Sequence, residues 1–148
     1  MRQLLVLAGV LLLAGCGDDA SLSGADGDRP QLVVAAATTL EQPLAACAED
    51  FPDARLTFRF AASDELAAEI RDDMPADVLA AASKPVQVLS RAGKLRQPVA
   101  FATRRAATYA AGVVTRSERP DAAEAFVDDL LAGGCHDALV AAGFDEPR

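Results

Sequence analysis

An α/β fold is predicted by three features of this chain: short apolar runs, amphipathic segments that alternate with them, and hydroxyl residues at the junctions. Twice in the central part of the chain, a run of small apolar residues ends in Ser or Thr and an amphipathic segment follows. The first run, 32–37, leads into Thr38 and Thr39, and the second, 56–62, leads into Ser63. We therefore predict a mixed, largely parallel sheet with helices on both faces.

Each predicted element has its own signal. The run at 32–37 is continuously apolar, as in a buried parallel strand, whereas apolar and polar residues alternate over 56–60, as in a half-buried strand. Pro75 ends the second helix, and Gly93 ends the third. The predicted strands are 32–37, 56–62, 76–80, 98–101 and 111–114, and the predicted helices are 38–50, 64–72, 84–91, 121–131 and 135–142.

The composition excludes several classes of function. The chain has 148 residues, which is enough for one domain with a real core. Its formal net charge of −8 disfavours binding to nucleic acid or to anionic lipid surfaces. Aromatic residues make up only 5% of the chain and Trp is absent, so a large aromatic binding platform is not expected.

The N-terminus has the pattern of an exported lipoprotein. Arg2 precedes an apolar run at 4–13 that is too short to span a bilayer and is typical of a signal peptide. The residues that follow, ending in Cys16, resemble a bacterial lipobox, which implies that Cys16 carries the lipid anchor. The alternative is an ordinary secretory signal with an incidental cysteine. We predict a signal peptide at 1–15, a flexible tether at 16–30 and a single α/β domain at 31–148.

Two further cysteines lie within the predicted domain. Cys47 falls on the apolar face of the first helix, and Cys135 lies near the start of the last helix. An exported protein permits a disulfide. The sequence is compatible both with a disulfide between them and with two buried thiols that act as small hydrophobes.

The two hydroxyl-containing junctions are the strongest candidate site. A helix N-terminus has unpaired backbone N–H groups and the positive end of the helix dipole, which favour an anion. Two such ends side by side would form a cradle for an oxyanion from Thr38, Thr39 and Ser63. The alternative is that these hydroxyls only cap their helices, in the pattern of capping boxes.

Three segments carry a resemblance to a known family. Residues 35–40, 60–67 and 75–79 resemble, in order and spacing, the first lobe of periplasmic molybdate-binding proteins, the solute receptors of ABC importers. In that family a hydroxyl at each of the first two junctions binds the tetrahedral oxyanion. The resemblance therefore implies that Thr38, Thr39 and Ser63 bind molybdate or tungstate, and that an ABC permease is the protein partner.

The resemblance continues at 109–144, which is similar to the segment that returns to the first lobe. Family members are longer because a second lobe is inserted between the equivalents of Phe101 and Tyr109, and that insertion is missing here. The missing lobe would supply backbone donors and a tyrosine, a role that the resemblance does not assign to Tyr109. Asp64 and Glu65 also depart from the family, which usually has small uncharged residues directly after the serine.

No other pattern points to chemistry. Cys135 and His136 are adjacent, but neighbouring residues on a helix point in different directions and no third catalytic member accompanies them. The chain has one histidine and no Cys or His cluster with zinc spacing, and it has no phosphate-binding loop or nucleophile elbow. We expect no enzyme activity, no metal and no cofactor. Asp77 is interpreted as a structural hydrogen-bonding group at the start of a strand, and the alternative is a residue of the ligand cleft.

The functional prediction is a lipid-anchored substrate-binding protein of an ABC importer that recognises a small oxyanion of the molybdate and tungstate class. The membrane contact is through the anchor at Cys16 and the location is extracytoplasmic. A second hypothesis belongs to a different class: a truncated envelope lipoprotein that keeps the fold, binds no solute and contacts a protein partner.

Overall fold

The computed structural model describes residues 28–148. The predicted signal peptide at 1–15, the lipid site at Cys16 and the tether as far as residue 27 lie outside the described residues. Within 28–148, no helix is both long and apolar enough to cross a bilayer.

The described residues form a five-stranded sheet with strand order β2-β1-β3-β5-β4. β1 pairs in parallel with β2 and β3, and β5 pairs antiparallel with β3 and β4, so four of the five strands run in the same direction. The prediction of a mixed, largely parallel sheet is confirmed. In chain order the elements are β1 (Gln31–Ala37), η2 (Thr38–Leu40), α1 (Glu41–Ala48), β2 (Arg55–Ala61), α2 (Ser63–Arg71), β3 (Val78–Ala82), α3 (Ser83–Arg91), β4 (Leu95–Arg104), β5 (Ala107–Val114), α4 (Pro120–Ala132) and α5 (Gly134–Ala141).

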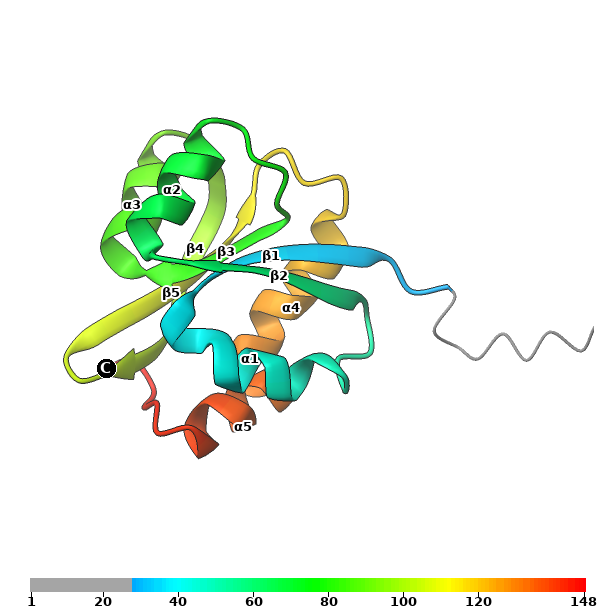
Figure 1. The fold of residues 1–148 in the computed structure, drawn as a ribbon, viewed down its shortest axis with the longest axis vertical. Helices are drawn as coiled ribbons and strands as arrows, with labels where there is room; N and C mark the ends of the chain where they lie inside the picture. The colour runs from blue at the N-terminus through cyan, green and yellow to red at the C-terminus, as the bar shows by residue number, and fades with distance from the viewer. Residues whose placement is uncertain (1–27) are drawn as a thin grey trace, which may run out of the picture.

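Helices cover both faces of the sheet. α2 and α3 lie on one face, and α1, α4 and α5 lie together on the other (Figure 1). The central strands are buried from both sides: Val34, Ala35 and Ala36 of β1 are fully buried. This burial explains why β1 is a continuous apolar run without alternation. Phe51 and Phe126 pack edge to face in the layer below the sheet.

The β4–β5 hairpin differs from the prediction. Both strands are longer than the predicted 98–101 and 111–114, and only Arg105 and Ala106 separate them. These two residues have φ of 49° and 65°, as in a type I′ turn. The prediction was too short because bulges break the pairing of β4, which removes the alternating pattern of a strand. This tight turn lies where the resemblance expects an inserted lobe.

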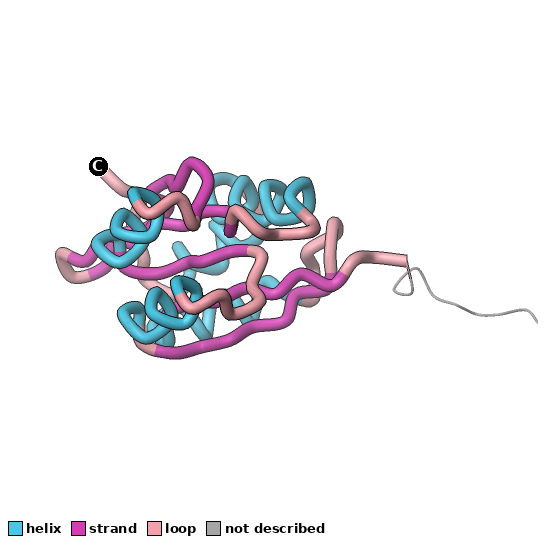
Figure 2. The backbone as a smooth tube through the Cα atoms, turned by 90° about the horizontal axis from the view of Figure 1, so that it is seen from above, coloured by secondary structure: helices cyan, strands magenta, loops and turns pink. Residues whose placement is uncertain are grey.

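The hairpin and the start of the described chain lie at opposite ends of the sheet, as two perpendicular views show (Figures 1 and 2). The carboxyl ends of β1, β2 and β3 lie at the hairpin end, because Ala82 of β3 pairs with Tyr109 near the start of β5. The sheet therefore has a carboxyl edge, which includes the hairpin turn, and an amino edge, where β1 begins.

Capping was predicted as the alternative role for the junction hydroxyls, and the structure contradicts it. Thr38 and Thr39 form a 3₁₀ turn ahead of α1, and no side chain makes a cap hydrogen bond there. Ser63 is the first residue of α2 rather than its cap, because the N-cap position belongs to Ala62. The capping boxes are therefore absent, and these hydroxyls are not engaged by the helix starts.

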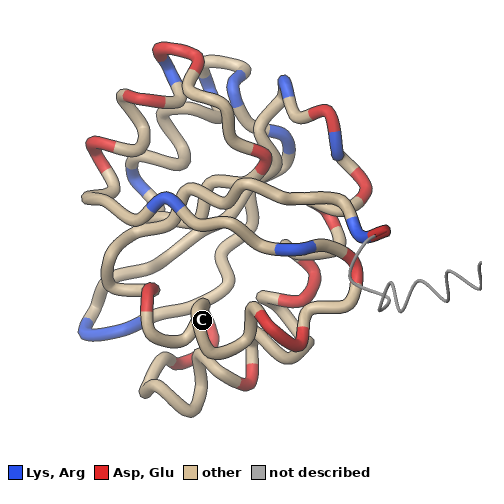
Figure 3. The backbone as a smooth tube through the Cα atoms, turned by 45° about the vertical axis from the view of Figure 1, so that its right-hand side comes forward, with Lys and Arg blue, Asp and Glu red and all other residues tan. Residues whose placement is uncertain are grey.

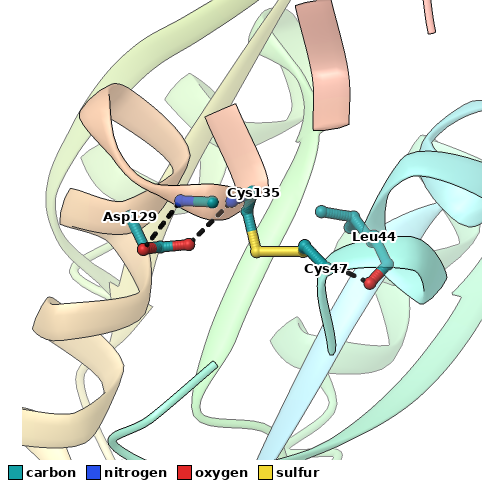
Figure 4. Close-up of a disulfide and its surroundings, with 5 residues drawn as sticks. Leu44, Cys47, Asp129 and Cys135 are labelled. Atoms are coloured by element: carbon teal, nitrogen blue, oxygen red, sulfur yellow. Dashed lines mark hydrogen bonds between the residues drawn. A yellow bond between two sulfur atoms is a disulfide. The ribbon is translucent and has the colours of Figure 1, made fainter. Parts of the chain in front are cut away.

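A disulfide joins the helices of the lower layer. Cys47 of α1 and Cys135 of α5 are bonded, with an S–S distance of 2.05 Å and a Cα–Cα distance of 5.0 Å (Figure 4). The carboxylate of Asp129 accepts hydrogen bonds from the N–H groups of Gly134 and Cys135, at 3.2 and 2.8 Å. The bond links segments 88 residues apart, so it holds the last helix against the first.

Candidate functional site

Three strand-to-helix junctions meet at the carboxyl edge. In the sheet register Ala37 of β1 faces Ala61 of β2, and Ala36 faces Ala80 of β3. Each of these strands leads into a hydroxyl residue: Thr38 directly follows β1, Ser83 directly follows β3, and Ser63 follows β2 after Ala62. In open α/β sheets the carboxyl edge at a switch in strand order is where ligands bind. The Ser83 junction was not predicted as part of the site, although the apolar run before Ser83 repeats the pattern of the other two.

Ser63 has the donor that an anion needs. Its side chain is half-buried, and its Oγ accepts a hydrogen bond from the Ala82 N–H at 3.1 Å. A serine hydroxyl has one proton to donate. Among residues 28–148, no acceptor takes that proton. Ser83 differs, because its hydroxyl donates to the Thr108 carbonyl at 3.0 Å and is already used.

Thr39 forms a second donor group with Tyr109. The Thr39 hydroxyl donates to the Tyr109 hydroxyl at 3.1 Å, so one proton joins the two oxygens and the pair keeps one further O–H donor. The Tyr109 ring packs edge to face on Phe144, and the Arg104 guanidinium lies 5.0 Å from the centre of the Phe144 ring. These contacts hold the Tyr109 hydroxyl in place.

The predicted site residues lie at one edge but do not bond to one another. Thr39 bonds to Tyr109, Ser63 bonds to Ala82, and the exposed Thr38 has no side-chain hydrogen bond within the described residues. Tyr109 was not predicted as a site residue. It reaches Thr39 through the pairing of β5 with β3, and no local sequence signal reports a contact across 70 residues.

A cleft of about 470 Å³ opens at this edge between α2, α3 and the hairpin. Its charged residues are Asp64 and Lys84, in the first turns of α2 and α3. Both are exposed, and the described chain gives neither an ion-pair partner. The full lining consists of Ser63, Asp64, Ala82, Ser83, Lys84, Pro85, Ala106, Ala107 and Thr108.

Glu65, the second acidic residue after Ser63, is neutralised within the chain. Arg59 Nη2 lies 3.0 Å from Glu65 Oε1 and 2.7 Å from Glu69 Oε1. The hydrogen bond to Glu69, with the nearby charges, raises the pKa of Arg59 above its ordinary value. Of the two acidic residues, only Asp64 therefore opposes an anion at the start of α2.

Basic residues are unevenly distributed between the two helical layers. α1, α4 and α5 contain no Lys or Arg, whereas α2 and α3 contain Arg71, Lys84 and Arg91. Figure 3 shows acidic positions predominating along the lower helices, with both signs mixed along the upper ones. An anion that approaches this protein is therefore repelled least on the α2 and α3 side.

The amino edge contains the one buried charged side chain of the described residues. Asp77 is 4% exposed, and its carboxylate accepts hydrogen bonds from the Val33 N–H at 2.8 Å and from the Ser117 hydroxyl at 2.6 Å. Asp77 thus ties β3 to β1 and to the loop after β5, which confirms its interpretation as a structural group. No group of His, Cys, Asp and Glu within 28–148 could hold a metal ion.

Comparison with known proteins places this arrangement in a family. The family model for bacterial extracellular solute-binding proteins matches residues 32–108, which include the three junctions and most of the hairpin. The chain belongs to this family. It is a family of binding proteins rather than enzymes, and its members are extracellular or periplasmic. A search of curated proteins finds no match.

Solved structures support the fold. The periplasmic molybdate-binding protein of Azotobacter vinelandii matches with a TM-score of 0.72 and 11% identity, covering 79% of this chain and 100% of that one. The sulfate-binding protein of Mycobacterium tuberculosis H37Rv matches with a TM-score of 0.68 and 10% identity, covering 80% and 87%. A substrate-binding domain assigned to a molybdenum ABC transporter of Clostridium difficile matches with a TM-score of 0.67 and 13% identity, covering 81% and 100%.

Proposed function

We propose that this solute-binding protein recognises a small tetrahedral oxyanion of the molybdate and tungstate class and delivers it to an ABC permease. The observation that carries the proposal is the Ser63 hydroxyl, which is fixed by the Ala82 N–H and has its own proton free at the carboxyl edge. The proposal is also supported by structures of similar fold that bind molybdate or sulfate, which are both tetrahedral oxyanions.

The donors come from two junctions at the carboxyl edge, and of these donors only Ser63 lines the cleft. Ser63 supplies one O–H, and the Thr39–Tyr109 pair supplies a second. Thr38 is exposed beside Thr39 and adds a third hydroxyl. Hydrogen bonds to a charged group contribute about 1.5–3 kcal/mol each when water is excluded, and less when it is not. In the open cleft we therefore expect weaker binding than in a receptor that encloses its ligand.

Asp64 opposes this binding. A carboxylate about 5 Å from a dianion costs several kcal/mol at an effective dielectric near 20. Lys84 lines the same cleft and offsets part of this repulsion. The balance of these two charges sets the affinity for a simple oxyanion.

The proposal includes attachment of the mature protein to the membrane through a lipid on Cys16. The cleft is lined by residues of the hairpin turn. The hairpin lies at the end of the sheet opposite the start of the described chain (Figures 1 and 2), so a tether at that start leaves the cleft open. A lipid anchor with two or more acyl chains gives stable membrane attachment.

The test is isothermal titration of molybdate, tungstate and sulfate into the purified protein, its Ser63→Ala variant and its Ser90→Ala variant. Ser90 lies in α3, does not line the cleft and provides a matched loss of a hydroxyl. We expect saturable heat with the parent protein and with Ser90→Ala, and a strong reduction with Ser63→Ala. No heat with any of the three anions would contradict the proposal.

The alternative function is an envelope lipoprotein that keeps the fold, binds no solute and contacts a protein partner. The observation that favours it is the unpaired Asp64 carboxylate next to the proposed anion site. Replacing Asp64 by Gly separates the two functions. If molybdate binds to Asp64→Gly but not to the parent protein, the hydroxyl donors of the site are intact, and the Asp64 carboxylate prevents the parent protein from binding a simple oxyanion.

A further inference from the structure

The cleft at the carboxyl edge is lined by two side chains of opposite charge that have no ion-pair partner within the described residues. Asp64 and Lys84 line the same cleft, yet they form no ion pair with each other or with another described residue. The other acidic residues of α2 are paired, Glu65 and Glu69 with Arg59, and Asp73 in the turn after α2 is paired with Lys94 and Arg116. Unpaired charges of both signs in one cleft suit a ligand that also carries both signs.

The size of the cleft also exceeds the needs of a simple oxyanion. A volume of about 470 Å³ falls within the usual range of pockets for small organic ligands. A tetrahedral oxyanion has only five heavy atoms. Pro85, Ala106 and Ala107 line the remaining space and offer an apolar surface for a short aliphatic segment.

The donors favour a tetrahedral group over a planar one. Of the groups that line the cleft, the Ser63 hydroxyl and the Lys84 ammonium are free to donate, since the Ser83 hydroxyl donates to the Thr108 carbonyl, and no arginine contributes a planar fork. An ammonium acts as a point charge, whereas bidentate recognition of a carboxylate is the role of arginine. A phosphonate or phosphate group therefore matches the donors at Ser63 and Lys84 better than a carboxylate does.

We propose that the solute is a small zwitterion in which a tetrahedral oxyanion and an ammonium group are joined by a short aliphatic chain, as in an aminoalkylphosphonate. The oxyanion lies against Ser63 and Lys84, and the ammonium pairs with Asp64. This assignment rests on the proposed oxyanion site at Ser63 and deepens it. Asp64, which opposes a simple oxyanion, becomes a residue that selects the ligand.

The test compares two ligands that differ only in the ammonium group. We would titrate 2-aminoethylphosphonate and ethylphosphonate into the parent protein, Asp64→Asn and Asp121→Asn. Asp121 also stands in the first turn of a helix and is exposed, but it lies on α4 outside the cleft. We expect the parent and Asp121→Asn to bind 2-aminoethylphosphonate about fivefold more tightly than ethylphosphonate, as for a partly exposed ion pair. In Asp64→Asn the preference should disappear.

Equal affinities in the parent protein, or a preference that survives in Asp64→Asn, would overturn the zwitterion assignment. β-Alanine, titrated in parallel, tests the tetrahedral group, and binding as tight as that of 2-aminoethylphosphonate would overturn that part. Molybdate is included so that the two proposals can fail separately. Molybdate binding through Ser63 without a preference for the zwitterion refutes only this inference, whereas no binding of any of these ligands refutes the oxyanion site as well.

Discussion

The two edges of the sheet differ in whether their polar side chains have partners within the protein. At the amino edge Asp77 is buried, and both of its oxygens accept hydrogen bonds from the protein. Asp73, nearby, is bridged by Lys94 and Arg116 at 2.9 and 2.7 Å. At the carboxyl edge Asp64, Lys84 and the Ser63 proton have no partner within the described chain.

This difference separates groups that stabilise the fold from groups that are available to a ligand. A buried carboxylate with two partners is costly to remove, because its partners are left unsatisfied. Exposed groups without partners contribute little to folding and can change with little effect on stability. Substitutions at the amino edge should therefore change stability, and substitutions at the carboxyl edge should change ligand binding.

The largest effect is expected from the disulfide, which lies outside both edges. Replacing Cys47 and Cys135 by Ala should lower the free energy of unfolding by about 2–4 kcal/mol, because the bond closes a long loop in the unfolded chain. Chemical denaturation measures this change. Alkylation of the unfolded, unreduced protein should leave both cysteines unlabelled, and labelling of either would contradict the disulfide.

The same double variant should affect the two donor groups of the carboxyl edge differently. α5 leads to Phe144, and the Phe144 ring packs on Tyr109. Loosening α5 should therefore weaken the Thr39–Tyr109 pair while leaving Ser63 in place. We expect a loss of oxyanion affinity smaller than the loss caused by Ser63→Ala.

At the amino edge, Asp77→Ala should lower the free energy of unfolding by about 2 kcal/mol, since the part-buried Val33 N–H and the Ser117 hydroxyl lose the acceptor that the buried Asp77 carboxylate provides. The matched substitution at the carboxyl edge, Asp64→Ala, should change it by less than about 0.5 kcal/mol. Urea unfolding of both variants checks the contrast. Similar stability losses in the two variants would show that the edges do not differ in this way.

At the carboxyl edge, Tyr109→Phe should lower oxyanion affinity about tenfold, because one hydroxyl of the donor pair is lost. The ring contact with Phe144 is kept, so stability should fall by only about 1 kcal/mol. Titration calorimetry and urea unfolding on the same preparation separate the two effects. An unchanged affinity would remove the Thr39–Tyr109 pair from the proposed site.

The smallest effect is a pH dependence at the amino edge. The hydrogen bonds from Lys94 and then Arg116 hold the pKa of Asp73 below its usual range. A depressed pKa in the folded state adds stability at pH values above the unfolded pKa, and this stability is lost as the pH falls through the folded value. The stability difference between the parent protein and Asp73→Asn should therefore be present at neutral pH and shrink below about pH 4. Asn tolerates the positive φ of 66° at this position, so the comparison isolates the charge.

Much of the fold could be predicted from local patterns. The continuous apolar run of β1, the alternation in β2 and the amphipathic α4 each report the surroundings of their own residues, so their positions were predicted within a few residues. The hairpin was predicted less well, because the bulges of β4 are set by pairing with β5 and not by a local preference. The capping prediction failed for a related reason, since the Ser63 hydroxyl bonds to Ala82 on another strand.

Periodicity and short motifs are enough to predict the α/β class, the junction hydroxyls at Thr38, Thr39 and Ser63, and the likeness to solute receptors. Which of these groups have partners depends on the tertiary structure. It placed Tyr109 on Thr39, left the Ser63 proton free, and set Asp64 and Lys84 in one cleft without pairing them. Hydrogen bonds and ion pairs act over a few ångströms, so they depend on which strands lie side by side, and sheet pairing brings together residues far apart in the chain.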